Sequence, residues 1–288
     1  MKRAYVVDAA RTAVGKFGGT LSSVRPDDLG ADVIKALVAR NLSIDLNEIE
    51  DVVFGAANQA GEDNRNVARM SLLMAGLPVT VPGLTINRLC ASSLQAIADV
   101  SKNIAIGYGD MFIAGGVESM TRAPFVFPKA ESAYSRAGQV YDTSIGWRFI
   151  NPKLSALYYP FTMGETAENV AEKYGITRQE QDEFAFQTQL NYQNALNANK
   201  FENEIIPVYI PQRKGDALVF QQDEHPRMST VDQLSNLSAA FKSGGTVTAG
   251  NSSGINDGAA ALLIVSEEAL KRYNLEPIAE VVSSAAAG

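Results

Sequence analysis

The chain has 288 residues, with 25 Lys and Arg against 32 Asp and Glu, so its formal net charge is −7 at pH 7. This acidic balance argues against a general surface for nucleic acids or anionic membranes, although a local basic site for a phosphorylated ligand stays open. The length suggests about two domains, and the single cysteine excludes an intrachain disulfide.

The N-terminus predicts no targeting segment. A strand-like stretch at residues 4–8 follows the first three residues directly, where a secretory signal would carry an apolar region. No apolar run approaches membrane-spanning length. We therefore expect a cytoplasmic protein that neither enters a membrane nor carries disulfides.

The first 120 residues alternate between strand-like and helix-like segments. Strands are predicted at 4–7, 51–55, 83–87 and 111–115, and helices at 26–40, at 66–75 and after Cys90. Such alternation predicts an α/β layer with mainly parallel strands, whose ends carry the chemistry. Residues 115–120 are expected to leave the sheet as a tight connection.

Cys90 lies where the predicted strand 83–87 gives way to a helix that ends near Gly107. The apolar residues of that helix recur with a period near 3.6: Leu94, Ile97, Ala98, Ile104 and Ala105. A cysteine that opens a helix meets unpaired N–H groups and the positive end of the helix dipole, which favour the reactive thiolate. Cys90 is therefore a candidate nucleophile, and a buried structural cysteine is the open alternative.

Between about Arg122 and Gly245 the alternation of strand-like and helix-like segments gives way to a more polar region, which indicates an insertion. Thr177 and Glu180 fit a capping box at the start of a helix that runs towards Ala198. Seven aromatic residues lie between loop signals in its first half, and we expect them to form a small core of the insertion: Tyr134, Tyr141, Trp147, Phe149, Tyr158, Tyr159 and Phe161.

The pattern typical of the α/β layer resumes at residue 246, and an apolar strand is predicted at 260–265. Gly250, Gly254 and Gly258 would let the backbone approach a ligand, or they simply punctuate a loop. His225 is expected in a surface loop without direct chemistry. The sequence contains no P-loop, no C-x-x-C pair and no H-E-x-x-H motif, so no metal site is expected.

Long motifs, in order along the chain, resemble those of thiolases. They are RTAVGKFGG at 11–19, NRLCASSLQA at 87–96, AGGVESM at 114–120, GETAENV at 164–170 and AGNSSGINDGAA at 249–260. Within that family, GEDNRNVAR at 61–69 and GWRFINP at 146–152 look closest to 3-oxoadipyl-CoA thiolases. The nearest alternative is a biosynthetic-type acetyl-CoA acetyltransferase.

The resemblance implies a layered α-β-α fold with an inserted loop domain. The N-terminal thiolase domain would comprise residues 1–121 and 246–274, and the coenzyme A-binding loop domain residues 122–245. Residues 275–288 would begin a C-terminal domain whose remainder is missing. Thiolases are dimers or dimers of dimers, so a homodimer or homotetramer is expected, joined through the N-terminal sheet and residues 59–69.

The resemblance also implies a chemistry, in which Cys90 accepts an acyl group from an acyl-CoA as a thioester and passes it to a second substrate. Coenzyme A and acetyl-CoA would be substrates, no cofactor would be tightly bound, and the pathway would be fatty acid or aromatic degradation. The site residues carried over from the family are Met163 beside the acyl group, Arg227 near the adenine, Ser253 near the pantetheine, and Ala249 and Gly250 in the tunnel backbone.

The chain departs from the family pattern in two ways. Thr162 stands where many thiolases have His, and the later family motifs Asn-Glu-Ala-Phe, Gly-His-Pro and Cys-x-Gly are absent. These motifs supply a general base for the nucleophile and a second cysteine for proton removal, so the chain alone is expected to be inactive. A non-catalytic acyl-CoA-binding or assembly module and a ketosynthase-like condensing enzyme stay open as alternatives.

Overall fold

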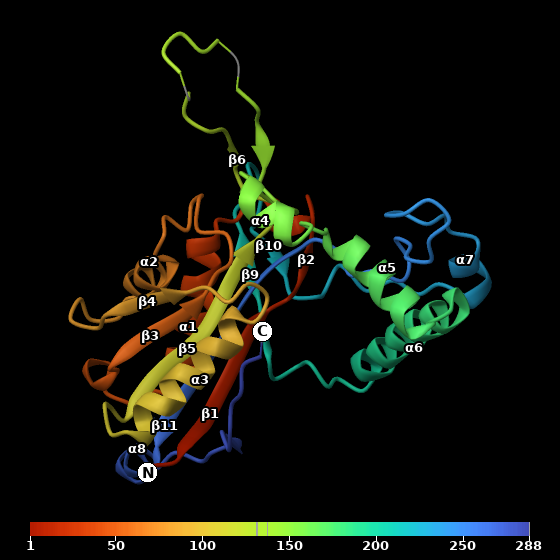
Figure 1. The fold of residues 1–288 in the computed structure, drawn as a ribbon. Coiled ribbons are helices and arrows are strands. Elements are labelled where there is room, and N and C mark those ends of the chain that lie inside the picture. Colours follow the sequence, from red (N-terminus) through yellow and green to blue (C-terminus); the bar gives the residue numbers. More distant parts are fainter. Residues whose placement is uncertain (131, 137, 288) are drawn as a thin grey trace. The chain divides into compact units, whose positions relative to one another are not determined.

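The computed structural model describes residues 1–130, 132–136 and 138–287. The chain forms two compact units (Figure 1). Unit 1 comprises Met1–Arg122, Asn203–Glu224 and Asn256–Gly288, and unit 2 comprises Ala123–Glu202 and His225–Ile255. Residues 203–224, which the sequence placed in the insertion, lie in unit 1, because β8 (Ile205–Ile206) pairs in parallel with β1 (Ala4–Thr12).

Unit 1 is built on a mixed sheet with the strand order β12-β1-β11-β5-β3-β4. The further strands are β3 (Asp51–Gly55), β4 (Gly83–Ile86), β5 (Met111–Ser119), β11 (Asn256–Ser266) and β12 (Ala279–Glu280). β3 pairs in parallel with β4 and β5, whereas β11 is antiparallel to both β1 and β5. The predicted parallel order therefore holds for β4, β3 and β5, and the strand that follows the insertion runs against it.

Helices cover both faces of this sheet, because successive side chains of β3 point to opposite faces and its last four residues are all buried. Phe54 packs in one apolar cluster with α1 (Pro26–Arg40) and α2 (Val67–Met74). Val53 packs in the other with α3 (Ser92–Ala105), which lies in front of the sheet in Figure 1. The expected α-β-α layering is confirmed for unit 1.

Two local predictions for unit 1 were wrong. Residues 115–119 do not leave the sheet, because β5 continues to Ser119 and Gly116 pairs with both Ala260 and Gly55. Gly258, expected in a loop or near a ligand, lies within β11 opposite Glu118. The apolar runs marked the strand centres, and pairing with β11 extended β5 beyond its apolar run.

The remaining segments of unit 1 are short. They are β2 (Gly15–Lys16), η1 (Thr20–Ser23), η2 (Leu46–Glu48), β9 (Val208–Ile210), β10 (Leu218–Phe220) and α8 (Glu267–Tyr273). β9 and β10 pair as a hairpin. Among the described residues of the whole chain, no helix is long and apolar enough to cross a membrane.

The regular secondary structure of unit 2 is mainly helical, with α4 (Pro152–Leu157), α5 (Met163–Tyr174), α6 (Arg178–Asn197) and α7 (Val231–Ser235). β6 (Phe125–Val126) and β7 (Tyr141–Asp142) form a small hairpin. The predicted capping box of Thr177 and Glu180 starts α6, and similar boxes that the sequence analysis did not single out start α5 and α7.

The aromatic residues in the first half of the insertion do not form a core, contrary to expectation. Tyr134, Trp147, Phe149, Tyr158, Tyr159 and Phe161 are exposed, and Tyr141 is half-buried. Their contacts are local, as between Tyr159 and Phe161, whose ring centroids lie 4.6 Å apart. The segment is rich in aromatic residues, but its apolar residues show no helix or strand periodicity. Its composition alone therefore could not predict which side chains would be buried.

Candidate active site

Cys90 is exposed and lies in the turn between β4 and α3. Ser92 closes this turn: its Oγ accepts a hydrogen bond from the Arg88 N–H at 2.8 Å and donates one to the Leu89 carbonyl at 2.6 Å. Asn87 braces it from the other side, because its Oδ1 accepts from the Leu89 N–H at 2.8 Å. Cys90 is therefore held on a turn whose backbone is fixed by its neighbours' side chains.

Leu89, directly before Cys90, has a φ of 49°, in the left-handed region that residues with a Cβ rarely adopt. Such a conformation costs about 1–3 kcal/mol and persists only where the surrounding structure imposes it. Here the bonds from Asn87 and Ser92 impose it. The strained residue turns the chain sharply from β4 towards α3 and leaves Cys90 on the outside.

The turn is also tied to the ends of β3 and β5. Asn87 Nδ2 donates to the Ala57 carbonyl at 2.9 Å, and Glu118 of β5 accepts from the Ala57 N–H at 2.7 Å. The start of α3 packs so closely on the sheet that a Cβ at Gly55 would collide with the backbone of Ser92, and one at Gly116 with Ser93. Two glycines and one carboxylate thus set the place of the Cys90 turn.

Cys90 does not itself open the helix, as the sequence suggested. Ala91 is the N-cap and α3 begins at Ser92, so Cys90 lies two residues before the first helical residue. The expected effect of the helix start on the thiol stays a prediction. The sequence could not predict that the helix begins at Ser92 and not at Cys90, because apolar periodicity locates the body of a helix better than its first turn.

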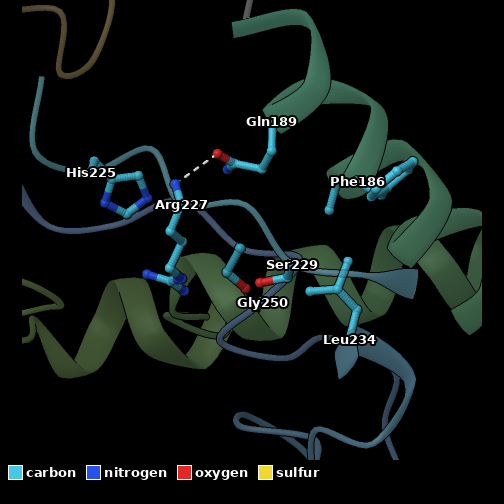
Figure 2. A pocket seen from close by; sticks show the side chains of 9 residues that line it. Phe186, Gln189, His225, Arg227, Ser229, Leu234 and Gly250 are labelled. Atoms are coloured by element: carbon cyan, nitrogen blue, oxygen red, sulfur yellow. Dashed lines mark hydrogen bonds between the residues drawn. The ribbon is translucent and has the colours of Figure 1, made fainter. Parts of the chain in front are cut away.

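A second candidate site is a pocket within unit 2 (Figure 2). It is lined by Ala185, Phe186 and Gln189 of α6 and by His225, Arg227, Ser229, Leu234, Gly250 and Ser252. The Arg227 N–H donates to Gln189 Oε1 at 2.9 Å, and its guanidinium donates to the Ala249 carbonyl at 2.8 Å. Arg227, Ala249 and Gly250, which the family resemblance selected, therefore lie together.

The other two residues selected in this region are placed differently. Ser253 is exposed and does not line the pocket, whereas its neighbour Ser252 does. Met163 is the first residue of α5, with 73% of its surface exposed, and it is not part of the pocket lining. The pocket thus brings together only part of the expected set.

Seven of the nine lining residues were not predicted as site residues from the sequence, and four of these seven are polar: Gln189, His225, Ser229 and Ser252. A Cβ at Gly254 would collide with the His225 ring, so this glycine makes room for the histidine. Burial, and then the positive charge of Arg227, lower the pKa of His225 below its usual 6.5. Among the described residues, the buried Ser252 Oγ has no hydrogen-bond partner. Gly254 was the only signal that could have pointed to His225.

No group of three or more His, Cys, Asp or Glu side chains that could hold a metal ion occurs in the described part of the chain. Unit 1 offers the exposed thiol of Cys90, which can act as a nucleophile. The pocket of unit 2, described by itself, offers arginine, histidine and hydroxyl groups, and its guanidinium can hold a phosphate.

Comparison with known proteins gives a consistent picture. Residues 4–268 match the family described as "Thiolase, N-terminal domain". The chain is 54% identical to a "Beta-ketoadipyl-CoA thiolase" of Acinetobacter baylyi, over all of this chain and 72% of that protein. It is 50% identical to the "3-oxoadipyl-CoA/3-oxo-5,6-dehydrosuberyl-CoA thiolase" of Escherichia coli K12, with the same coverage.

Among solved structures, the chain resembles the acetyl-CoA acetyltransferase of Bacillus anthracis. The TM-score is 0.89 at 36% identity, over 98% of this chain and 70% of that one.

Proposed function

Because the chain belongs to the thiolase family of acyltransferases, we propose that Cys90 accepts the acyl group of a CoA thioester. The Sγ, after losing its proton to solvent, attacks the thioester carbonyl carbon as a thiolate, the bond from that carbon to the CoA sulfur breaks, and CoA leaves as its thiolate. The observation that carries this proposal is the exposed Cys90 on a strained turn, fixed by Asn87 and Ser92.

Attack on the carbonyl creates an oxyanion, which backbone N–H groups stabilise when they are already aimed at it. We place the Cys90 N–H among these donors, since the braced turn holds its peptide group in one orientation. The collision that any Cβ at Gly55 would make with Ser92 supports this rigidity. Preorganisation of this kind lowers the barrier because no donor has to move during the reaction.

Unit 2 is proposed to bind coenzyme A, which is a substrate and not a resident cofactor. Arg227 lines the pocket and would pair with a phosphate or lie near the adenine. The backbone of Ala249 and Gly250, together with Ser253, would follow the pantetheine, and Met163 would contact the acyl group. Arg227 already donates to the Ala249 carbonyl, which couples the two parts of this set.

The proposed substrate is a 3-oxoacyl-CoA whose acyl chain ends in a free carboxylate. Two relatives at 54% and 50% identity are named for beta-ketoadipyl-CoA or 3-oxoadipyl-CoA, and a relative at 42% is named an acetyl-CoA acetyltransferase. In thiolysis Cys90 would attack the 3-oxo carbon, the bond between carbons 2 and 3 would break, and acetyl-CoA would leave after protonation. CoA would then take the acyl group from Cys90.

The 288 residues contain one cysteine and one histidine, His225. Once Cys90 carries the acyl group, no second thiol of this chain can remove or return the proton at carbon 2. We therefore propose that this chain alone loads an acyl group but does not complete condensation or thiolysis. A chain that bound CoA without acylation would instead be an acyl-CoA-binding module.

We further propose a homodimer or homotetramer in the cytoplasm. Among the strands that the structure describes, β4 pairs with β3 alone, and Leu84 in β4 and Leu89 after it are exposed. Apolar side chains at an open sheet edge favour pairing with a second copy. Light scattering coupled to size exclusion gives the molar mass, and a monomer at micromolar concentration contradicts this part of the proposal.

Intact-mass spectrometry after brief incubation with acetyl-CoA tests acyl loading. The proposal predicts an acetyl adduct on the wild-type chain and none on Cys90→Ser. An unmodified wild-type chain that is folded by circular dichroism overturns it. CoA binding to the same protein, measured by calorimetry, then decides whether a binding module remains.

A further inference from the structure

Two carboxylates buried in unit 2 both contact the loop at residues 246–253, which carries Ala249, Gly250 and Ser253. Glu168 of α5 is 4% exposed and Asp182 of α6 is 1% exposed. We propose that Asp182 is a positioning residue, which fixes this loop through Asn251 in the conformation that binds coenzyme A. Nothing in the sequence motifs assigned a role to Asp182. The inference rests on the proposed function of unit 2.

Asn251 is the centre of the arrangement. Its Oδ1 accepts from the Thr248 N–H at 2.7 Å, and its Nδ2 donates to the Thr246 carbonyl at 3.1 Å. The same Nδ2 donates to Asp182 Oδ1 at 2.9 Å. The side chain thus holds the loop backbone at two points, and Asp182 orients the side chain.

Glu168 anchors the beginning of the same loop. It accepts hydrogen bonds from the Thr246 N–H at 2.9 Å and from the Val247 N–H at 2.8 Å. Burial alone would raise the pKa of Glu168, but these backbone donors together lower it below its usual 4.5. A Cβ at Gly245 would collide with the carboxylate, so the glycine permits this contact.

Asp182 also connects the loop to α7, whose Leu234 lines the same pocket. Arg178 donates from Nε to Asp182 Oδ2 at 2.8 Å, and from Nη2 to the carbonyls of Leu234 at 2.6 Å and Leu237 at 2.9 Å. The side chains of these two leucines lie where a Cβ at Gly250 would be. One ion pair on α6 therefore holds both α7 and the loop that faces it.

The loop depends on side-chain hydrogen bonds because it has no regular secondary structure. Residues 246–253 lie outside the helices and strands, so their buried N–H groups need other acceptors. Glu168 and Asn251 supply acceptors at its start, and Thr248 Oγ1 accepts from the Gly250 N–H at 3.2 Å. A loop ordered before ligand arrives spares the ligand the entropic cost of ordering it.

Exchanging the two groups tests the inference. In Asn251→Asp two carboxylates face each other, whereas D182N/N251D restores one donor and one acceptor between positions 182 and 251. Calorimetry with CoA and hydrogen exchange of residues 246–251 are measured on the 288-residue chain. We expect Asn251→Asp to weaken CoA binding and to speed amide exchange by tenfold or more. The double variant should recover part of both, because it restores the contact with position 182 while a carboxylate at position 251 still cannot donate to the Thr246 carbonyl.

A matched control separates positioning from general stability. Ala195→Gly weakens α6 at a half-buried position thirteen residues after Asp182, so it should lower the melting temperature without changing CoA affinity or loop exchange. The inference is overturned if Asn251→Asp leaves loop exchange at the wild-type rate, or if Ala195→Gly weakens CoA binding equally. Absence of CoA binding in the wild type contradicts the proposed function instead, and loop exchange still reports on the positioning role.

Discussion

Gly55 at the end of β3 and Ser92 at the start of α3 lie so close that the backbone of Ser92 occupies the space of any Cβ at position 55. The turn that carries Cys90 is therefore placed by a contact that only glycine allows. Because the turn is joined directly to Ser92, a side chain at position 55 should displace it.

Gly55→Ala tests this contact. The added methyl should move the start of α3 and destabilise unit 1 by about 1–3 kcal/mol, the usual cost of overpacking a well-packed core. The acetylation rate of Cys90 should fall more than tenfold. Chemical denaturation and intact-mass kinetics measure the two effects.

Gly258→Ala is the matched control. It lies in the same sheet, but its Cβ would make ordinary contact with Thr12 Oγ1 at 3.4 Å. Equal losses in both variants would show that the effect belongs to the sheet in general and not to the Cys90 turn.

Leu89 predicts an unusual order of substitutions. Its positive φ favours glycine, so Leu89→Gly should retain folding and acetylation at close to wild-type level. Leu89→Val should cost about 1–2 kcal/mol more than Leu89→Gly, because β-branched residues tolerate this region poorly. Denaturation curves of the two variants give the difference, and a valine variant as stable as the glycine variant contradicts the strained turn.

Ser252 and Ser253 make a second matched pair. The Ser252 Oγ is buried at the pocket without a partner among the described residues, so Ser252→Ala should not lower stability. If bound CoA satisfies this hydroxyl, the variant loses about 1 kcal/mol of affinity, or roughly fivefold. Calorimetry that finds Ser253→Ala weakened and Ser252→Ala unchanged would instead favour the family assignment.

His225 should make the stability of the protein depend on pH. Its pKa is lowered in the folded chain, chiefly by burial, so the unfolded chain binds the proton first as the pH falls below the usual 6.5. Stability therefore decreases between pH 7 and pH 5, by at most about 1.4 kcal/mol per pH unit for one proton. His225→Phe should show a smaller decrease in denaturation experiments at pH 7, 6 and 5.

His225 is the only histidine, so the difference between the two proteins reports on this group alone. Parallel pH profiles would mean that His225 titrates equally in the folded and unfolded chains.

Much of unit 1 could be predicted because its signals are local. Residues 51–55 form β3 and residues 26–40 form α1, as their apolar patterns indicate. The antiparallel placement of β11 could not be predicted in this way. It depends on contacts such as that between Ser119 and Asp257, which are 138 residues apart, and no local pattern records such a partner.

The sites were predictable to different degrees. Cys90 was identified from one helix period and a family motif, whereas the strain at Leu89 depends on hydrogen bonds from its neighbours. Asp182 gave no signal, because a carboxylate on a polar helix usually faces solvent. The reason for its burial is evident only from the structure, in which Asp182 accepts hydrogen bonds from both Asn251 and Arg178.

The position of β11 between β1 and β5 sets an order of assembly. During synthesis from the N-terminus, β1 and β5 emerge long before residues 256–266, and neither strand pairs with the other in the finished sheet. Until β11 arrives, each keeps an unpaired edge, which is a template for wrong association. The middle of the sheet therefore closes only after a strand that follows the whole of unit 2 has been made, and only β12 joins the sheet after it.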